Sequence, residues 1–182
     1  MDDIVKAALR KWPNVPHCYG WLALDARGNW FMRDDRTQAA GPFPQAKGSR
    51  IEHRKLIDFI ERNTGADDRG NAYFQNGPQR VYLELEAAPW VWRLTAAAPA
   101  GKDAQPMVHG HDGQATQVRS VWLDEQGRVF LDTELGFGLV HTLDMETAAA
   151  AVEAGVWQPQ ELSFSQMPGR FGYVLHPQTS GT

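Results

Sequence analysis

The sequence predicts an α+β protein of two related units, each a curved antiparallel sheet carrying one helix. One observation is an internal sequence repeat. The stretch LDARGNWFM (24–32) is similar to LDEQGRVFL (123–131), with Leu, Asp, Gly and Phe at the same positions. Each copy also precedes a stretch of helical spacing and then strand-like stretches. Between them, the segment TAAAPAGKDAQP has the composition of a linker. We therefore expect an N-terminal unit over 1–95, a linker over 96–106 and a C-terminal unit over 107–182.

Local patterns predict the elements of the first unit in chain order. Apolar residues at helical spacing in 4–12 indicate a short helix that Pro13 stops. The sequence Asp-Ala-Arg-Gly at 25–28 suits a type I turn with a glycine bulge, between strands at 21–24 and 29–33. The glycine- and proline-rich segment 38–48 is expected to be a loop, and 53–63 a helix ending near Gly65. Strands are expected at 73–74, 81–86 and 90–94.

The second unit is expected to repeat this order. Strands at 118–123 and 128–132 flank the turn 124–127, and 135–141 is a further strand. A helix over 144–154 ends at Gly155. Aromatic segments at 162–165 and 171–175 are expected to be strands, and the tail PQTSGT to be frayed.

Composition and charge narrow the class of protein. Apolar residues make up 42% and charged residues 22%, as in a soluble globular protein. Up to Thr95 there are 14 Lys and Arg against 12 Asp and Glu, and beyond it 4 against 10, so a mildly basic half precedes an acidic one. The sequence has no long cluster of basic residues of the kind that binds nucleic acid. The single cysteine, the acidic start MDDIVKAALRKW and the lack of a long apolar run favour a cytoplasmic protein that does not enter membranes.

The chain resembles the bacterial domain-of-unknown-function family 1285. The resemblance rests on GNWFM (28–32), IEHRKLIDFI (51–60) and RVYLELEAAPWV (80–91), with a looser match in LDEQGRVFL and in the helix before GVW. It implies a duplicated α+β core, a second half superficially like a pleckstrin-homology domain, a ligand site between the halves and a role in signalling. The loop 38–48 departs from the family pattern and could cover or remodel such a site.

Two side-chain groups suggest chemistry, and each has a structural alternative. His109, His111 and Asp112 could begin a metal site, but the neighbouring sequence offers no closed ligand set, so structural or solvated histidines are favoured. His17 and Cys18 could form a base and thiol, but adjacent residues rarely align for proton transfer, so an inert thiol is favoured. No phosphate loop or nucleophile elbow occurs, and we predict no catalytic residue, metal or cofactor.

The remaining polar and aromatic residues suggest a ligand site. We expect a cleft between the units for a small anionic ligand, for example a nucleotide-like one, lined by His53, Arg54, Arg80, Trp90 and Arg93. Arg54 could instead pair along its helix, and Trp90 could belong to the core. The favoured function is a non-catalytic ligand-sensing or signalling scaffold. The alternatives are a module that uses exposed sheet edges to bind a protein partner or a second copy, and a metal-dependent hydrolase.

Overall fold

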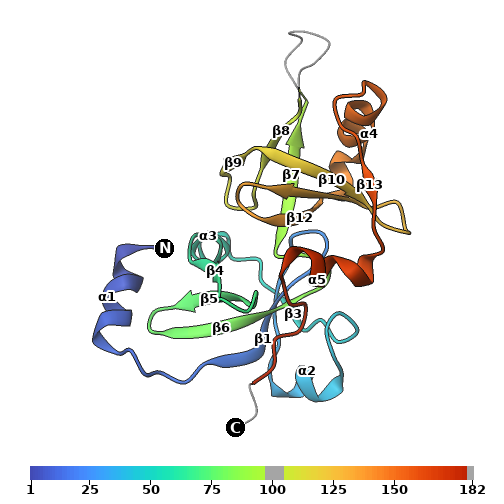
Figure 1. Ribbon diagram of the computed structural model, residues 1–182. Helices are drawn as coiled ribbons and strands as arrows, with labels where there is room; N and C mark the ends of the chain where they lie inside the picture. Colours follow the sequence, from blue (N-terminus) through green and yellow to red (C-terminus); the bar gives the residue numbers. More distant parts are fainter. Residues whose placement is uncertain (97–104, 180–182) are drawn as a thin grey trace. The chain divides into compact units, whose positions relative to one another are not determined.

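The computed structural model describes residues 1–96 and 105–179 and divides the chain into two compact units (Figure 1). The first comprises Met1–Asp25, Asn29–Glu86 and the end of the chain from Gly172. The second comprises Ala26–Gly28 and Ala87–Phe171. Each unit has its own sheet with a few helices, so the predicted α+β class with two units is confirmed.

The first unit has a six-stranded sheet in the order β3-β2-β1-β6-β5-β4. The pairing of β1 with β6 is parallel and the other pairings are antiparallel, so the sheet is mixed rather than wholly antiparallel. Its elements are α1 (Asp3–Lys11), β1 (Cys18–Leu24), β2 (Trp30–Met32), α2 (Asp35–Ala40), β3 (Ser49–Arg50), α3 (Arg54–Arg62), β4 (Thr64–Ala66), β5 (Ala72–Asn76) and β6 (Gln79–Leu85).

The second unit has a seven-stranded sheet in the order β13-β10-β11-β12-β7-β8-β9. It too is mixed rather than wholly antiparallel, because β13 pairs parallel to β10 and β7 pairs parallel to β12. Its core packs Trp92 and Leu131 against Ala148 and Ala151 of helix α4. Its elements are β7 (Trp90–Thr95), β8 (Met107–His109), β9 (Ala115–Thr116), β10 (Val118–Leu123), β11 (Val129–Thr133), β12 (Phe137–Val140), the short 3-10 turn η1 (Thr142–Asp144), α4 (Met145–Glu153), β13 (Gln160–Glu161), η2 (Phe164–Gln166) and α5 (Met167–Phe171).

Four strands and one helix occur in the same chain order and with the same strand pairing in both units. In the first unit the hairpin β1-β2 is followed by β3, by α3 and finally by β6, which pairs parallel to β1. In the second unit the hairpin β10-β11 is followed by β12, by α4 and finally by β13, which pairs parallel to β10. The orders β6-β1-β2-β3 and β13-β10-β11-β12 are therefore equivalent, and the predicted relation between the units is present in the topology.

The two hairpin turns share their hydrogen bonds as well as their sequence. Asp25 Oδ1 accepts from the backbone N–H of Asn29 at 2.8 Å, and Asp124 Oδ1 accepts from that of Arg128 at 2.8 Å. The fourth turn residues, Gly28 and Gly127, have φ values of 74° and 72°, a conformation that favours glycine. The aspartate and the glycine thus hold each turn closed.

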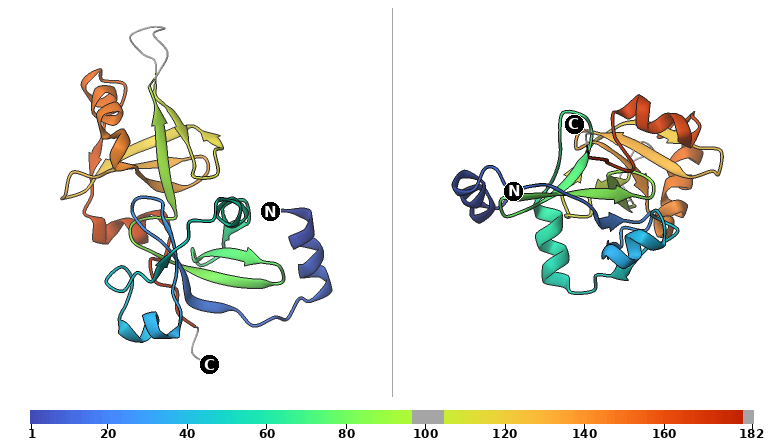
Figure 2. Two further views of the ribbon diagram at one scale, coloured as in Figure 1. Left: turned by 180° about the vertical axis from the view of Figure 1, so that it is seen from behind. Right: turned by 90° about the horizontal axis from the view of Figure 1, so that it is seen from below.

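The structure divides the chain at a different place from the one the sequence suggested. Residues 90–95 were expected to end the first unit, but β7 pairs with β12 and β8 and so belongs to the sheet of the second. The chain from Gly172 returns to the first unit (Figure 2). Most of the expected linker 96–106 lies outside the described residues.

The expected strands at 162–165 and 171–175 are absent among the described residues. This segment instead forms η2, α5 and irregular chain. Phe164, Met167 and Phe171 recur at helical spacing, and Met167 is fully buried. The helical period of this segment therefore agrees with its structure, whereas its aromatic content does not.

Candidate functional site

A hollow of about 380 Å³ lies entirely within the first unit. Four segments of chain supply its walls: β1, the segment from Arg33 to Pro42, β6 and the end of the chain. The lining residues are Tyr19, Gly20, Arg33, Gln38, Gly41, Pro42, Glu84, His176, Pro177 and Gln178. The volume falls within the range of sites for small molecules.

The segment 38–48, expected as a loop, is an ordered wall of this hollow. It begins within helix α2, where Asp34 caps the helix by accepting from the N–H of Thr37 at 2.8 Å. Phe43 is buried in a small core with Ala23 and Phe31. The buried Phe43 ring and the helix cap explain why this segment is ordered despite its glycine and proline residues.

Arg33 ties this wall to the sheet. Its guanidinium donates to the carbonyl oxygens of Ala46 at 3.0 Å, Gly20 at 3.3 Å and Gly41 at 2.7 Å. The residue is only 3% exposed, and among the described residues no carboxylate forms a salt bridge with it. The carbonyls satisfy three of its five N–H donors but do not neutralise its charge. A buried cation therefore borders the hollow.

A carboxylate–imidazole pair, Glu84 and His176, also lines the hollow. Glu84 Oε2 is 2.6 Å from His176 Nδ1. The Glu84 side chain is 10% exposed and that of His176 is 44% exposed. With Nδ1 facing the carboxylate, the imidazole orientation is fixed.

The chain end that carries His176 is held along the first sheet. The N–H of Val174 donates to the carbonyl of Gly70 at 3.1 Å, and the N–H of Leu85 donates to the carbonyl of Leu175 at 2.9 Å. Pro177 is buried. The expectation of a frayed tail from residue 177 is therefore wrong for Pro177 and Gln178, which line the hollow.

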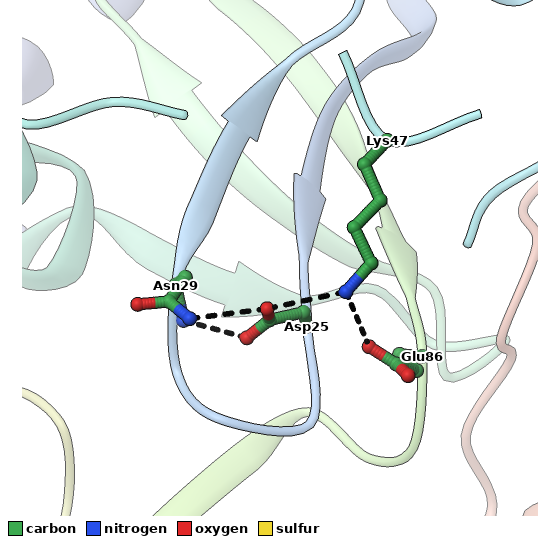
Figure 3. Close-up of polar contacts among 4 residues, drawn as sticks. All are labelled: Asp25, Asn29, Lys47 and Glu86. Carbon is green, nitrogen blue, oxygen red and sulfur yellow. Dashed lines mark hydrogen bonds and ion pairs between the residues drawn. The ribbon is translucent and has the colours of Figure 1, made fainter. Parts of the chain in front are cut away.

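Lys47 fixes the far end of the same wall (Figure 3). Its Nζ lies 3.4 Å from Asp25 Oδ2 and 3.4 Å from Glu86 Oε2. Asp25 is the buried aspartate that closes the β1-β2 turn through Asn29. One ammonium group thus links the wall, the hairpin and the end of β6.

Three of the five expected ligand residues, His53, Arg54 and Arg80, lie in the first unit, and each has a structural partner. His53 caps α3, where its Nδ1 accepts from the N–H of Leu56 at 3.3 Å. Arg54 pairs with Asp58 at 2.8 Å, the helical pairing that the sequence left open. The guanidinium of Arg80 lies 4.3 Å from the centre of the Tyr73 ring.

The other two expected residues, Trp90 and Arg93, lie on β7 in the second unit. Trp90 stacks on Trp92, with ring centres 5.1 Å apart, and on His111 at 4.6 Å. Arg93 Nε donates to Asp144 Oδ2 at 2.6 Å. Burial acts to raise the pKa of Asp144, but the hydrogen bonds from Arg93 and from the N–H of Leu94 outweigh burial and lower it. Arg93 therefore already has a partner carboxylate.

The two other groups of side chains that suggested chemistry each contact neighbouring side chains. The His111 ring is buried against Trp90, and burial lowers its pKa to about 4. Asp112 accepts from the side chain of Gln114 at 2.7 Å. In the part of the chain that the structure describes, no three His, Cys, Asp or Glu residues are grouped as metal ligands. The His17 ring packs edge-on against Tyr82, 5.6 Å away.

Sequence patterns did not indicate three polar residues that line the hollow, Arg33, Glu84 and His176. Arg33 ends a strand and precedes a loop, which gives it no distinctive pattern. Glu84 alternates with apolar residues, a pattern typical of a half-buried strand with its polar side chains in solvent, but residues 81–85 are all buried. His176 stands next to the tail expected to fray. The one available signal was that the long Gly/Pro segment 38–48 begins five residues after Arg33.

Comparisons with known proteins agree with this two-unit α+β architecture. The family model DUF2944, described as a protein of unknown function (DUF2946), matches residues 1–178. The chain belongs to that family. No curated protein matches.

Two solved structures are similar. A DUF1285 family protein from Silicibacter pomeroyi DSS-3 has a TM-score of 0.52 and 13% identity, over 77% of this chain and 73% of that one. A second, from Shewanella baltica OS155, has a TM-score of 0.49 and 14% identity, over 75% of this chain and 96% of that one. The first likeness shows the fold, which confirms the resemblance to family 1285. Separately, none of the described helices has the length and apolar character needed to cross a membrane.

Proposed function

We propose that this protein is a non-catalytic ligand-sensing module of the cytoplasm and that the first-unit hollow binds a small anionic ligand. The observation that carries the proposal is Arg33, a guanidinium that is 3% exposed, borders the hollow and bonds only neutral carbonyls among the described residues. Buried charges are normally paired because desolvation disfavours them. An anion in the hollow would supply the missing charge and accept from the two remaining N–H donors.

This location replaces the expected set of five residues for a physical reason. Arg54 and Arg93 already pair with Asp58 and Asp144, so an anion would have to displace a carboxylate from either of them. Arg33 has no such competitor in the described salt bridges. We therefore keep the anionic ligand predicted from the sequence and propose Arg33 as the residue that binds it.

The alternative function, binding of a protein partner at an exposed sheet edge, receives less support from the structure. The edge strands of the two sheets are β3, β4, β9 and β13, and they have two, three, two and two residues. Short edges offer few backbone groups to an added strand, which is how natural sheets avoid such pairing. A partner protein bound through β-strand addition is therefore the weaker proposal.

The test is thermal stabilisation by anions. Ligands that bind only the folded state raise its stability, so we would scan phosphate, sulfate, succinate and a nucleoside monophosphate from 0.1 to about 10 mM. The variant Arg33→Met should abolish stabilisation by an anion that stabilises the wild type. The control is Arg54→Met, which removes an exposed, paired arginine of the same unit and should respond like the wild type.

A second variant keeps the test decisive if Arg33→Met fails to fold. Gln178 is exposed and lines the hollow, so Gln178→Trp should narrow the site without disturbing the core. It should weaken anion binding while the melting temperature of the free protein stays near that of the wild type. The proposal is wrong if no compound that carries an anionic group, whether a simple anion or a zwitterion, stabilises the wild type. It is also wrong if Gln178→Trp and any folded Arg33 variant bind as the wild type does.

A further inference from the structure

The hollow that we propose as an anion site contains two buried side chains of opposite charge. Arg33 is 3% exposed and Glu84 is 7% exposed, and both are among its lining residues. They are not paired with each other in the described salt bridges. A lone anion would gain from Arg33 but would be repelled by Glu84. The ligand that suits both carries a negative and a positive group.

The Glu84 carboxylate has room for a cationic donor. His176 Nδ1 contacts Oε2 alone, and an ionised carboxylate has two oxygens with about four acceptor positions. A buried carboxylate gains more from a charged donor than from a neutral one, because charge-assisted hydrogen bonds are stronger. An ammonium group would satisfy this requirement.

Tyr19 adds a surface that also favours an ammonium group. One face of its ring stacks on Tyr82, with ring centres 4.7 Å apart, and Tyr19 lines the hollow. Aromatic faces attract organic cations. Gln38 and Gln178 supply neutral polar groups at the same lining.

We infer that the hollow binds a small zwitterion of the amino-acid class, with its carboxylate at Arg33 and its ammonium group at Glu84. This inference rests on the proposed function, since it assumes that Arg33 holds the anionic group. A zwitterion neutralises both buried charges without bringing net charge into the site. The volume of about 380 Å³ admits a molecule of this size.

The test compares each amino acid with two matched compounds that lack one charge. A panel of the common amino acids is screened first by thermal shift. Any that stabilises the protein is then titrated calorimetrically beside its deaminated acid and its decarboxylated amine, for example alanine beside propionate and ethylamine. We expect the amino acid to bind roughly ten- to a hundredfold more tightly than either, the effect of one charge-assisted bond.

Glu84→Gln should remove the preference for the amino acid over its deaminated acid, whereas Arg33→Met should abolish binding of both. The control is Glu86→Gln, the same substitution two residues along, where the carboxylate pairs with Lys47 outside the hollow. It should keep the wild-type preference. The wild-type comparison alone remains decisive if Glu84→Gln does not fold.

The outcomes separate the two proposals. If simple anions bind and amino acids bind no better, the zwitterion is wrong and the anion site stands. If amino acids bind but Glu84→Gln leaves their preference unchanged, the assignment of the ammonium group to Glu84 is wrong. If neither simple anions nor amino acids bind, both proposals fail.

Discussion

Glu84 and His176 are 92 residues apart in the chain, and their side chains meet at 2.6 Å. This contact joins the last part of the described chain to the strand at the centre of the first sheet, β6, which lies between β1 and β5. The same contact supplies one wall of the hollow. Its energetic role can be separated from ligand binding by substitution in the free protein.

Removing the imidazole alone should cost more than removing both partners. His176→Ala leaves a buried carboxylate without its partner, and because water can reach the vacated space we expect a loss of about 1 kcal/mol in the free energy of unfolding. Adding Glu84→Gln should recover part of that loss. Urea denaturation of the two single variants and the double variant measures the coupling. Strictly additive losses would show that the pair has no energetic coupling.

A matched pair of glycines tests how firmly the chain end is held. Gly70 and Gly127 each occupy the fourth position of an Asp-x-x-Gly turn, with φ of 81° and 72°. A Cβ on Gly127 would meet no described atom within 4 Å, so Gly127→Ala should cost about 1 kcal/mol, the backbone strain alone. A Cβ on Gly70 would collide with the carbonyl oxygen of Gly172. Gly70→Ala should therefore cost at least about 1 kcal/mol more.

Limited proteolysis provides the second readout for these variants. Displacement of Gly172 should release the segment that carries His176, so Gly70→Ala should be cleaved near the C-terminus faster than Gly127→Ala. It should also lose affinity for any ligand of the hollow. Equal cleavage and equal stability of the two variants would contradict the proposed docking of the chain end.

The glycine turns also show what a local motif can and cannot predict. A third Asp-x-x-Gly turn, 67–70, has the same bond from a backbone N–H, that of Asn71, to Asp67 Oδ1 at 2.9 Å. This turn joins β4 and β5, which are not part of the repeated core. The motif therefore predicts a hairpin and no more. The relation between the units rests on the shared strand order, which sequence periodicity could only suggest.

Long-range contacts explain the parts of the site that sequence patterns did not predict. The hairpins, the main helices and most strands follow local rules of turn chemistry and period, and they were predicted. Arg33 bonds carbonyls 8 to 13 residues away, and Glu84 meets a residue 92 positions away. No window of neighbouring residues contains such information. The same reason explains the misplacement of β7, whose sheet is decided by its pairing with β12.

Two buried tryptophans of the second unit should respond differently to the same substitution. Trp157 Nε1 is buried without a hydrogen-bond partner among the described residues, whereas Trp92 Nε1 donates to the carbonyl of Leu131 at 3.3 Å. Both changes to Phe remove the same volume from one core. Trp157→Phe also removes an unsatisfied donor, so it should be about 1–2 kcal/mol less destabilising than Trp92→Phe. Thermal or urea unfolding measures the difference, and equal losses would indicate that Trp157 has a partner such as buried water.

The buried imidazole of His111 predicts a loss of stability in mild acid. Burial lowers its pKa from 6.5 to about 4, although the nearby Asp112 acts in the opposite direction. Between these values the unfolded chain binds more protons than the folded one, so stability is complete above about pH 6.5 and falls as the pH decreases. The expected loss is about 2 kcal/mol by pH 5. Urea denaturation from pH 7.5 to 5 measures it.

His111→Phe isolates this effect, because phenylalanine can stack on Trp90 as the imidazole does but cannot take up a proton. The variant should be less sensitive to pH between 6.5 and 5 than the wild type by about the same 2 kcal/mol. Asp144 does not interfere in this range: its pKa is lowered, so its contribution is kept until lower pH. The wild-type protein would then unfold in acid mainly because a histidine that packs as an aromatic ring in the second unit must become charged. A pH profile that His111→Phe leaves unchanged would assign the acid sensitivity to other groups.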